Sequence, residues 1–189
     1  MKQFLVLAVM VVFAACNNSS STPSDSAKAG ADSSSAKMRD IQSPYAIDYS
    51  SKFTIDDPKN AESLLALWKA FDNGNLSAAK DLFADTVEMN FADGMKMRAS
   101  RDSIIAAGQA YRNSLGAVVE NVHAIMAVKS TDKDEHWALI WGTEKNTHKD
   151  GKVDSTDLQE TWMFKDGKAA LMYQFRADYM APKAAKGKK

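Results

Sequence analysis

One glutamate, Glu160, lies among aromatic residues in a segment whose pattern predicts a strand. Residues 153–165 alternate between apolar and polar side chains, which is the period of a strand with one buried face. Asp150-Gly151 and Asp166-Gly167 flank this segment, and Asp-Gly pairs are typical of two-residue hairpin turns. A carboxyl group on an apolar face loses hydration, which raises its pKa into the range used by general acids and bases. Glu160 is therefore the first candidate for a catalytic group.

Counting residues outward from two-residue turns predicts the neighbours of this glutamate. Trp141 and Tyr173 then lie directly opposite Glu160, and side chains directly opposite each other share a face of the sheet. The looser turn STDKDE places His123 near Trp141. Because an imidazole beside a carboxyl group can share a proton transfer, we predict a Glu160–His123 acid/base pair in an aromatic pocket. The alternative is structural: Glu160 accepts a hydrogen bond from Tyr173 or a tryptophan, or reaches the rim.

The same register predicts which side chains line the pocket. The inner face of the sheet is expected to hold Trp137, Leu139, Trp141, Leu158, Trp162, Phe164, Leu171, Tyr173 and Phe175. The outer face is expected to hold Glu144, Gln159, Thr161, Met163, Gln174 and Arg176. With two aromatic residues from predicted helices, the expected ligand pocket consists of Trp68, Tyr111, Trp137, Trp141, Trp162 and Tyr173. The alternative is that the tryptophans simply fill the core.

Composition excludes several other kinds of site. The chain has 189 residues with 24 basic and 24 acidic side chains, whereas a general nucleic-acid binder shows a basic face. The single cysteine excludes an internal disulfide and a cysteine-rich zinc site. The three histidines show no tight ligand spacing. We therefore expect no metal, no cofactor and no nucleic-acid partner.

The single cysteine, Cys16, follows the apolar residues 4–13 and two alanines. This run of about ten residues is too short for a membrane-spanning helix of ~20 and fits the apolar part of a signal peptide. Small residues before one cysteine resemble the lipobox of bacterial lipoproteins. The resemblance implies cleavage before Cys16, lipid attachment to it, and a membrane-anchored place in the bacterial cell envelope, facing the periplasm or the surface. An ordinary secretory signal is the alternative.

Composition also divides the chain into segments. Residues 1–15 are the predicted signal peptide, and residues 16–37, rich in serine and poor in large apolar side chains, predict a flexible linker behind the anchor cysteine. Residues 38–56 carry spaced apolar side chains and predict an N-terminal arm that lies against the folded body. Residues 57–180 form the predicted folded domain, and residues 181–189 predict a basic disordered tail.

The folded domain is predicted to begin with helices and to end with strands. Asp57-Pro58 starts a helix whose apolar stripe includes Trp68 and which Gly74 ends. A short helix, a hairpin around Asp93-Gly94 and a third helix capped by Ser100 follow. Segments with a period of two then predict four strands, at residues 118–129, 136–146, 153–165 and 168–178. Helices segregated from an antiparallel sheet make an α+β domain.

Two phrases in this domain are LLALWKAFDNGNLSAAKDLFADTVEMNFADG and, at the end of the strands, LQETWMFKDGKAALMYQF. With the order of elements they resemble the nuclear transport factor 2-like (NTF2-like) superfamily, and within it the SnoaL-like proteins. The resemblance covers roughly residues 57–178. It implies a cone in which three N-terminal helices pack in the concavity of a curved, mainly antiparallel sheet, with a pocket in the hollow. Because this fold hosts isomerases, dehydratases, hydrolases, cyclases and dimerising transport factors, it predicts little about chemistry.

These observations leave three hypotheses for function. The leading one is a lipid-anchored, non-enzymatic protein whose pocket binds a small hydrophobic or aromatic ligand. The second is a lyase, isomerase or hydrolase that uses Glu160 and His123. The third is an interaction module that forms a homodimer through the outer face of the sheet, as many relatives do.

Overall fold

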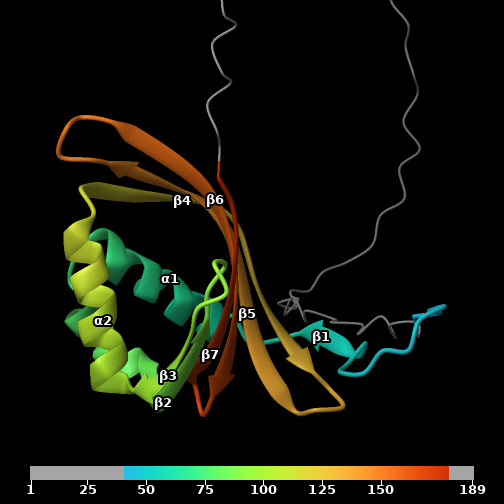
Figure 1. The fold of residues 1–189 in the computed structure, drawn as a ribbon. Coiled ribbons are helices and arrows are strands. Elements are labelled where there is room, and N and C mark those ends of the chain that lie inside the picture. Colours follow the sequence, from blue (N-terminus) through green and yellow to red (C-terminus); the bar gives the residue numbers. More distant parts are fainter. Residues whose placement is uncertain (1–40, 179–189) are drawn as a thin grey trace, which may run out of the picture. The chain divides into compact units, whose positions relative to one another are not determined.

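The computed structural model describes residues 41–178, and its framework is one seven-stranded sheet in the order β1-β4-β5-β6-β7-β2-β3 (Figure 1). Every neighbouring pair of strands is antiparallel except β2 and β7, which run parallel. The strands are β1 (Phe53–Ile55), β2 (Phe83–Asn90), β3 (Lys96–Ser100), β4 (Ala117–Ser130), β5 (Glu135–Thr147), β6 (Val153–Lys165) and β7 (Lys168–Asp178).

The helices lie in the hollow of the curved sheet, all on one side of it (Figure 1). They are α1 (Lys59–Asp72), the 3-10 helix η1 (Leu76–Leu82) and α2 (Arg101–Ser114). The long meander β4-β5-β6-β7 follows them along the chain. The predicted α+β fold, with three helices in the concavity of a mainly antiparallel sheet, is confirmed.

The core lies between α1 and the inner face of the sheet. Leu64 and Trp68 recur at helical spacing on α1, so that both side chains face the sheet and are buried. Their partners in the buried cluster include Ile140 of β5, Trp162 of β6 and Met172 of β7. The strands that close the cavity described below are thus tied to α1 by apolar burial.

The ends of the helices follow the predicted signals. Gly74 takes a φ of 66° just after α1, a left-handed conformation that glycine adopts without strain. Asp57 lies one residue before the N-cap of α1, and its carboxylate accepts a hydrogen bond of 2.9 Å from the backbone nitrogen of Lys59. The hydroxyl of Ser100 accepts from the backbone nitrogen of Ser103 at 3.4 Å and caps α2, as predicted.

The turn between β5 and β6 is longer than predicted. The backbone nitrogen of His148 donates to the carbonyl of Lys152 at 2.8 Å, so these two residues close the loop and three residues lie between them. Gly151, the last of the three, has a φ of 82°. This is the usual three-residue hairpin, in which a left-handed glycine follows a tight turn, and it shifts the register by one residue.

The turn between β6 and β7 has the predicted two residues. Lys165 lies opposite Lys168, and Asp166 and Gly167 both have positive φ, 51° and 71°. A β-bulge follows at once, because the regular pairing resumes only at Leu171. The bulge adds one residue to β7, which shifts the register here as well.

These two shifts turn β5 and β7 over relative to the prediction. Glu160 lies opposite Ile140 on β5 and Gln174 on β7, so the prediction that it lies opposite Trp141 and Tyr173 is wrong. A slip of one residue moves a whole strand's side chains to the other face. Trp137, Leu139, Trp141, Leu171, Tyr173 and Phe175 therefore lie on the outer face, whereas Glu144, Gln174 and Arg176 lie on the inner face. The predictions for β6 are correct.

Residues 41–58 form an N-terminal arm beside the sheet. Its strand β1 pairs with β4, with Phe53 opposite Ser130. Tyr49 packs edge-on against Trp137, with ring centroids 6.4 Å apart, and its hydroxyl donates to Glu135. This contact explains why Trp137 is only 7% exposed although it lies on the outer face.

The predicted signal peptide, Cys16, the linker and the basic tail lie outside the described residues. Within residues 41–178, none of the helices combines the length and the apolar character needed to cross a membrane. Over the same residues, no group of histidine, cysteine and acidic side chains could hold a metal ion.

Candidate functional site

Glu160 accepts three hydrogen bonds in the core, and none comes from a histidine. Its Oε2 accepts from the indole Nε1 of Trp68 at 2.8 Å and of Trp162 at 2.9 Å, and its Oε1 accepts from Nε2 of Gln174 at 3.0 Å. The side chain is 7% exposed. Because buried indole N–H groups need acceptors, Glu160 fixes both tryptophan rings. These contacts match the structural alternative for this residue.

His123 lies on the opposite face of the sheet from Glu160, so the predicted acid/base pair is not formed. His123 is the extra residue of a β-bulge between Val122 and Ala124. It is exposed, and its Nε2 lies 3.2 Å from the hydroxyl of Thr143, an outer-face residue. The prediction fails because the longer β5–β6 loop places Trp141, the expected neighbour of His123, on the outer face. In addition, β4 contains a bulge at His123 that an alternating pattern does not reveal.

A cavity of about 760 Å³ occupies the space between the helices, the β2–β3 hairpin and the inner face of β4 to β7. We call it the main cavity. Of the predicted lining residues, Trp68, Tyr111 and Trp162 line it, whereas Trp137, Trp141 and Tyr173 do not. Apolar side chains make up most of its wall, including Leu67, Phe71, Met89, Phe91, Met95, Met97, Leu115, Leu158 and Met172.

The position of Trp68 depends on a glycine in the facing strand. A Cβ atom on Gly142 of β5 would lie 2.7 Å from Cζ3 of Trp68 and 2.8 Å from the backbone oxygen of Asn121. Only a residue without a Cβ lets the indole approach the strand this closely. The glycine and the carboxylate of Glu160 together hold this side of the cavity.

Two further glutamates lie at one end of the main cavity. Glu120 of β4 and Glu144 of β5 are directly opposite each other and both line the cavity. We call them the carboxyl pair. Burial, followed by the charges of Glu144, Glu160 and Asp72, raises the pKa of Glu120 to about 8. Its Oε2 is buried and has no hydrogen-bond partner among residues 41–178.

The pKa of Glu144, the second member of the pair, is also raised. Burial raises the pKa of Glu144, while the nearby positive charge of Arg176 opposes the rise and the charge of Glu160 adds to it. Because two carboxylates close together cannot both ionise cheaply, the pair retains a proton at neutral pH. In a mostly apolar wall, the carboxyl pair can therefore both donate and accept a hydrogen bond.

Contacts at the end of α1 position the carboxyl pair. Oδ1 of Asp72 accepts from the backbone nitrogen of Glu120 at 3.0 Å. The guanidinium of Arg112 on α2 donates to the carbonyl oxygens of Phe71 at 2.8 Å and Asp72 at 3.0 Å. A third donation, to Gly116 at 2.9 Å, ties in the start of β4. Arg112 thus joins α1, α2 and β4 beside the pair.

Reasoning from the sequence missed the carboxyl pair for a definite reason. A two-residue β5–β6 loop puts Glu144 on the outer face, whereas the actual three-residue loop puts it on the inner face. Glu120 lies among valines in VVENV, and an acid within an apolar strand is the signal that could have drawn attention to it. With the three-residue loop, the cross-strand count places Glu144 on the same face as Glu160.

No protein-family model matches the chain, and no curated protein matches it. Solved structures do match, at low identity. A candidate polyketide cyclase from Streptomyces antibioticus, IdmH, is 13% identical with a TM-score of 0.51, over 62% of this chain and 91% of its own. A candidate SnoaL-like polyketide cyclase from Jannaschia sp. CCS1 is 11% identical with a TM-score of 0.53, over 65% and 90%.

An epoxide hydrolase of M. tuberculosis, described as LEH-like, is 12% identical with a TM-score of 0.53, over 63% of this chain and 83% of its own. At such identities the likeness shows the fold alone. The domain has the NTF2-like fold of SnoaL-like proteins, and the predicted fold is confirmed. Because one fold hosts many functions, any argument about function must come from the side chains in the main cavity.

Proposed function

We propose that the domain binds a small, mainly hydrophobic ligand in the main cavity, with the ligand's polar group at the carboxyl pair. The observation that carries this proposal is a cavity of about 760 Å³ whose wall is mostly apolar, with Glu120, Glu144 and Arg176 among its polar lining residues. Ligand sites in proteins have volumes of roughly 300–1,000 Å³ and a small number of polar groups, which fix the orientation of the ligand.

The contacts favour a ligand that carries a hydroxyl or carbonyl group. A protonated Glu120 donates a hydrogen bond, and Glu144 accepts one. Glu160 is less suited to contact a ligand, because Trp68, Trp162 and Gln174 already donate to its two oxygens. It supports the wall, and the carboxyl pair supplies the recognition.

Binding of N-phenyl-1-naphthylamine, a neutral apolar fluorescent probe, tests the proposal. Met97→Trp adds bulk to a half-buried residue of the wall and should weaken binding at least about tenfold, a loss of about 1.4 kcal/mol. Met126→Trp makes the same change at a residue on the outer face of β4 that is 40% exposed, and should leave binding unchanged. Equal affinities for the two variants would refute the site. If Met97→Trp alone weakens binding, native mass spectrometry of protein purified from its own cells would identify the natural ligand.

Proton transfer on the bound ligand is the second candidate function. The pKa of Glu120, raised to about 8, and its unpartnered Oε2 favour it, since a general acid or base works best with a pKa near the working pH. This replaces the predicted Glu160–His123 pair by the carboxyl pair. Because one structure with this fold is an LEH-like epoxide hydrolase, styrene oxide is a reasonable first substrate. Hydrolysis by the wild type that Glu120→Gln abolishes would support catalysis, and an inert wild type would oppose it for this substrate.

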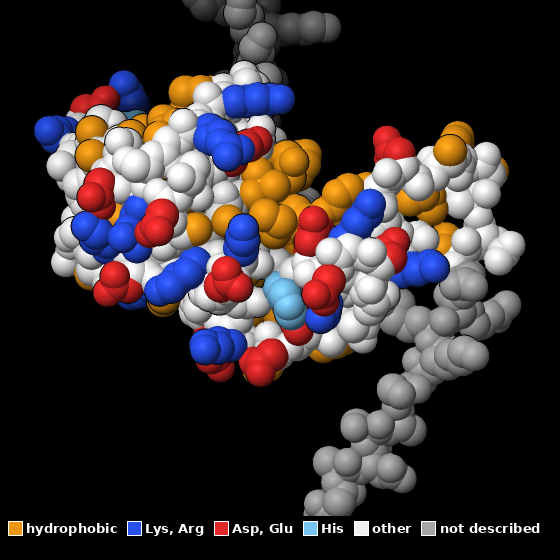
Figure 2. All heavy atoms as spheres, turned by 90° about the horizontal axis from the view of Figure 1, so that it is seen from below, with side chains coloured by type: hydrophobic (Ala, Val, Ile, Leu, Met, Phe, Trp, Pro, Cys, Tyr) orange, Lys and Arg blue, Asp and Glu red, His pale blue; other side chains and the backbone are white. Residues whose placement is uncertain are grey.

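A homodimer through the outer face of the sheet is also proposed, because this face exposes several large apolar side chains. Phe175 is 58% exposed and Tyr173 is 40% exposed. Hydrophobic side chains gather in the recess between the body of the domain and the N-terminal arm, in the face that Figure 2 shows. Light scattering should give a dimer for the wild type and a monomer for Phe175→Glu. A wild-type protein that remains a monomer at high concentration would contradict the proposed homodimer.

Anchoring to a membrane through Cys16 remains part of the proposal. The support is the sequence alone: an apolar run, small residues and one cysteine before a serine-rich segment. Cys16→Ser should move the protein from the membrane fraction of the cell to the soluble fraction, since acyl chains supply the anchoring. Recovery of this variant in the membrane fraction would contradict lipid attachment at Cys16.

A further inference from the structure

A second cavity, of about 590 Å³, shares only Phe83 with the main cavity. Residues of β2, β3, the start of α2 and the β6–β7 turn line it. We call it the basic hollow because it contains two arginines and two lysines. The full lining consists of Phe83, Ala84, Asp85, Thr86, Glu88, Arg98, Arg101, Met163, Lys165, Asp166, Lys168, Ala170 and Leu171.

An irregular pairing of strands opens the sheet at this place. Phe83 of β2 pairs with Ala169 of β7, but the next pair is Glu88 with Leu171. Residues 84–87 therefore pass opposite a single residue, Ala170, which the β6–β7 ladder also skips. Such bulges often lie beside functional sites, because they re-aim side chains and leave room between strands.

The charged groups of the hollow favour an anion. Its cations are Arg98, Arg101, Lys165 and Lys168, against the acids Asp85, Glu88 and Asp166. Arg98 is held only loosely, by Glu88 at 3.5 Å, and its side chain is 73% exposed. The positive groups thus exceed the negative ones, and the ion pairs between them are long.

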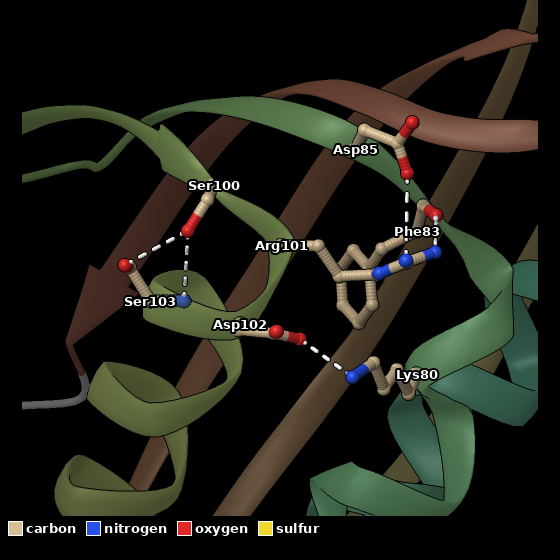
Figure 3. Close-up of polar contacts among 7 residues, drawn as sticks. All are labelled: Lys80, Phe83, Asp85, Ser100, Arg101, Asp102 and Ser103. Carbon is tan, nitrogen blue, oxygen red and sulfur yellow. Dashed lines mark hydrogen bonds and ion pairs between the residues drawn. The ribbon is translucent and has the colours of Figure 1, made fainter.

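Within residues 41–178, the acceptors of Arg101 all lie at long range. Nη2 lies 3.4 Å from Oδ1 of Asp85, and Nη1 lies 3.5 Å from the carbonyl oxygen of Phe83, as Figure 3 shows. Close charge-assisted hydrogen bonds are about 2.7–2.9 Å. Nε is buried and has no acceptor among residues 41–178. The side chain of Asp85 is 95% exposed, so an incoming anion can displace it into solvent at little cost.

The backbone of Arg101 is fixed although its side chain is not well paired. The hydroxyls of Ser100 and Ser103 lie 2.9 Å apart, and Asp102 forms an ion pair of 2.8 Å with Lys80 of η1 (Figure 3). These contacts hold the first turn of α2 against η1. The guanidinium therefore stays at the hollow with no close partner in the described part of the chain.

Two lysines lie opposite each other on the other side of the hollow. Lys165 and Lys168 are cross-strand partners that flank the β6–β7 turn. Like charges directly opposite each other destabilise a sheet. Lys168 donates to the carbonyl oxygen of Asp81, and within residues 41–178 neither ammonium has a carboxylate at ion-pair distance. An anion between these lysines and Arg101 would relieve the repulsion.

We propose that the basic hollow binds the anionic oxygens of a small ligand, a carboxylate or a phosphate group, between Arg101 and the Lys165–Lys168 pair. The guanidinium presents two N–H groups that match two oxygens of such a group, and the ammonium groups supply charge from the other side. Met163 and Leu171 line the same hollow and would contact an apolar part of the ligand. This site is independent of the main cavity.

Titration of the full-length chain with sodium phosphate and with sodium acetate, each at constant ionic strength set with sodium chloride, tests the proposal by amide NMR. Saturable shifts are expected at residues 84–86 and 168–171, with no shift of the indole signals of Trp68 and Trp162 in the core. Stronger binding of one salt than the other tells phosphate from carboxylate ligands. Shifts spread over the whole surface without saturation would overturn the site.

Charge variants give the second arm of the test. Arg101→Gln and Lys165→Gln should each weaken binding about fivefold, as expected for loss of one partly exposed ion pair. Asp85→Asn removes the competing carboxylate and should strengthen binding. Lys145→Gln is the matched control, because it removes one positive charge from an exposed residue of β5 outside the hollow. Among residues 41–178 the ammonium of Lys165 has no ion pair to lose. Equal affinities of Lys165→Gln and Lys145→Gln would therefore refute the proposal even if Arg101→Gln failed to fold.

Discussion

Glu120 and Glu144 lie directly opposite each other on β4 and β5, at one end of the main cavity. Like charges in this relation repel, and burial removes the water that would screen them. The pKa of Glu120, raised to about 8 by burial first and then by Glu144 and Glu160, expresses this cost. The pair is kept in spite of its cost to stability, which favours a role in binding or chemistry over one in folding.

The stability of the protein should fall as pH rises because of Glu120. Its pKa is about 8 in the folded state and 4.5 in its ordinary state, so between these values the folded protein holds a proton that the unfolded chain has lost. The contribution of this bound proton to the free energy of unfolding is complete below about pH 4.5 and is lost as pH rises through about 8. Glu120→Gln should remove this dependence. From pH 5 to pH 9, its unfolding free energy should rise relative to that of the wild type by on the order of a few kcal/mol.

Urea denaturation at the two pH values measures this difference. Glu62→Gln, at an exposed position on α1, is the matched control and should follow the wild type. If Glu120→Gln and the wild type keep the same difference in unfolding free energy at both pH values, the raised pKa of Glu120 is refuted.

Replacing Glu160 should affect stability more than ligand binding. Glu160→Leu leaves the indole N–H groups of Trp68 and Trp162 without their acceptor, each costing about 1–3 kcal/mol. Glu160→Gln keeps one oxygen that can accept from both indoles, so its loss should be smaller. Equilibrium unfolding in urea measures both, and the shift of the two indole signals in NMR spectra identifies the cause. Equal losses for the two variants would contradict the role of the acceptor.

The sequence was sufficient for the fold because its strongest signals are local. The apolar stripe that includes Trp68 predicts α1, Ser100 predicts the start of α2, and alternation predicts the four long strands. Each signal depends on residues close together in the chain. Gly74 shows the same at the end of α1, where its left-handed φ follows from the turn itself.

The site could be predicted only in part, because facing depends on single residues in turns and bulges. Asp150-Gly151 belongs to a three-residue loop, and Ala170 is an extra residue in β7; either is invisible to an alternating pattern. Trp68 and Trp162 were placed correctly because their own elements fix their direction. Trp141 was not, since its facing was inferred across a turn.

Gly142→Ala should destabilise the protein through the wall of the main cavity. The added methyl group would lie 2.7 Å from the Trp68 ring and 2.8 Å from the backbone oxygen of Asn121, and neither can move far. Overpacking of this kind costs about 1–3 kcal/mol. The thermal midpoint should fall, and the indole signal of Trp68 should shift because its hydrogen bond to Glu160 is disturbed. An unchanged midpoint and an unchanged indole signal would contradict the close packing of Trp68 against Gly142.

The last prediction concerns the arm, where Tyr49 covers Trp137 of the outer face. Burial, followed by the hydrogen bond to Glu135, raises the pKa of Tyr49 to about 12. Tyr49→Ala should expose the indole of Trp137 and speed the solvent exchange of its N–H, measured by NMR. Tyr49→Phe keeps the edge-on contact and should have a smaller effect. Tyr45→Ala, at an arm residue that is 80% exposed, should change nothing. Because β1 pairs with β4 through its backbone, the arm should remain attached in all three variants. The indole of Trp137 donates to the same oxygen of Glu135 that accepts from the Tyr49 hydroxyl, so Tyr49→Phe separates the loss of that hydroxyl from the loss of the ring.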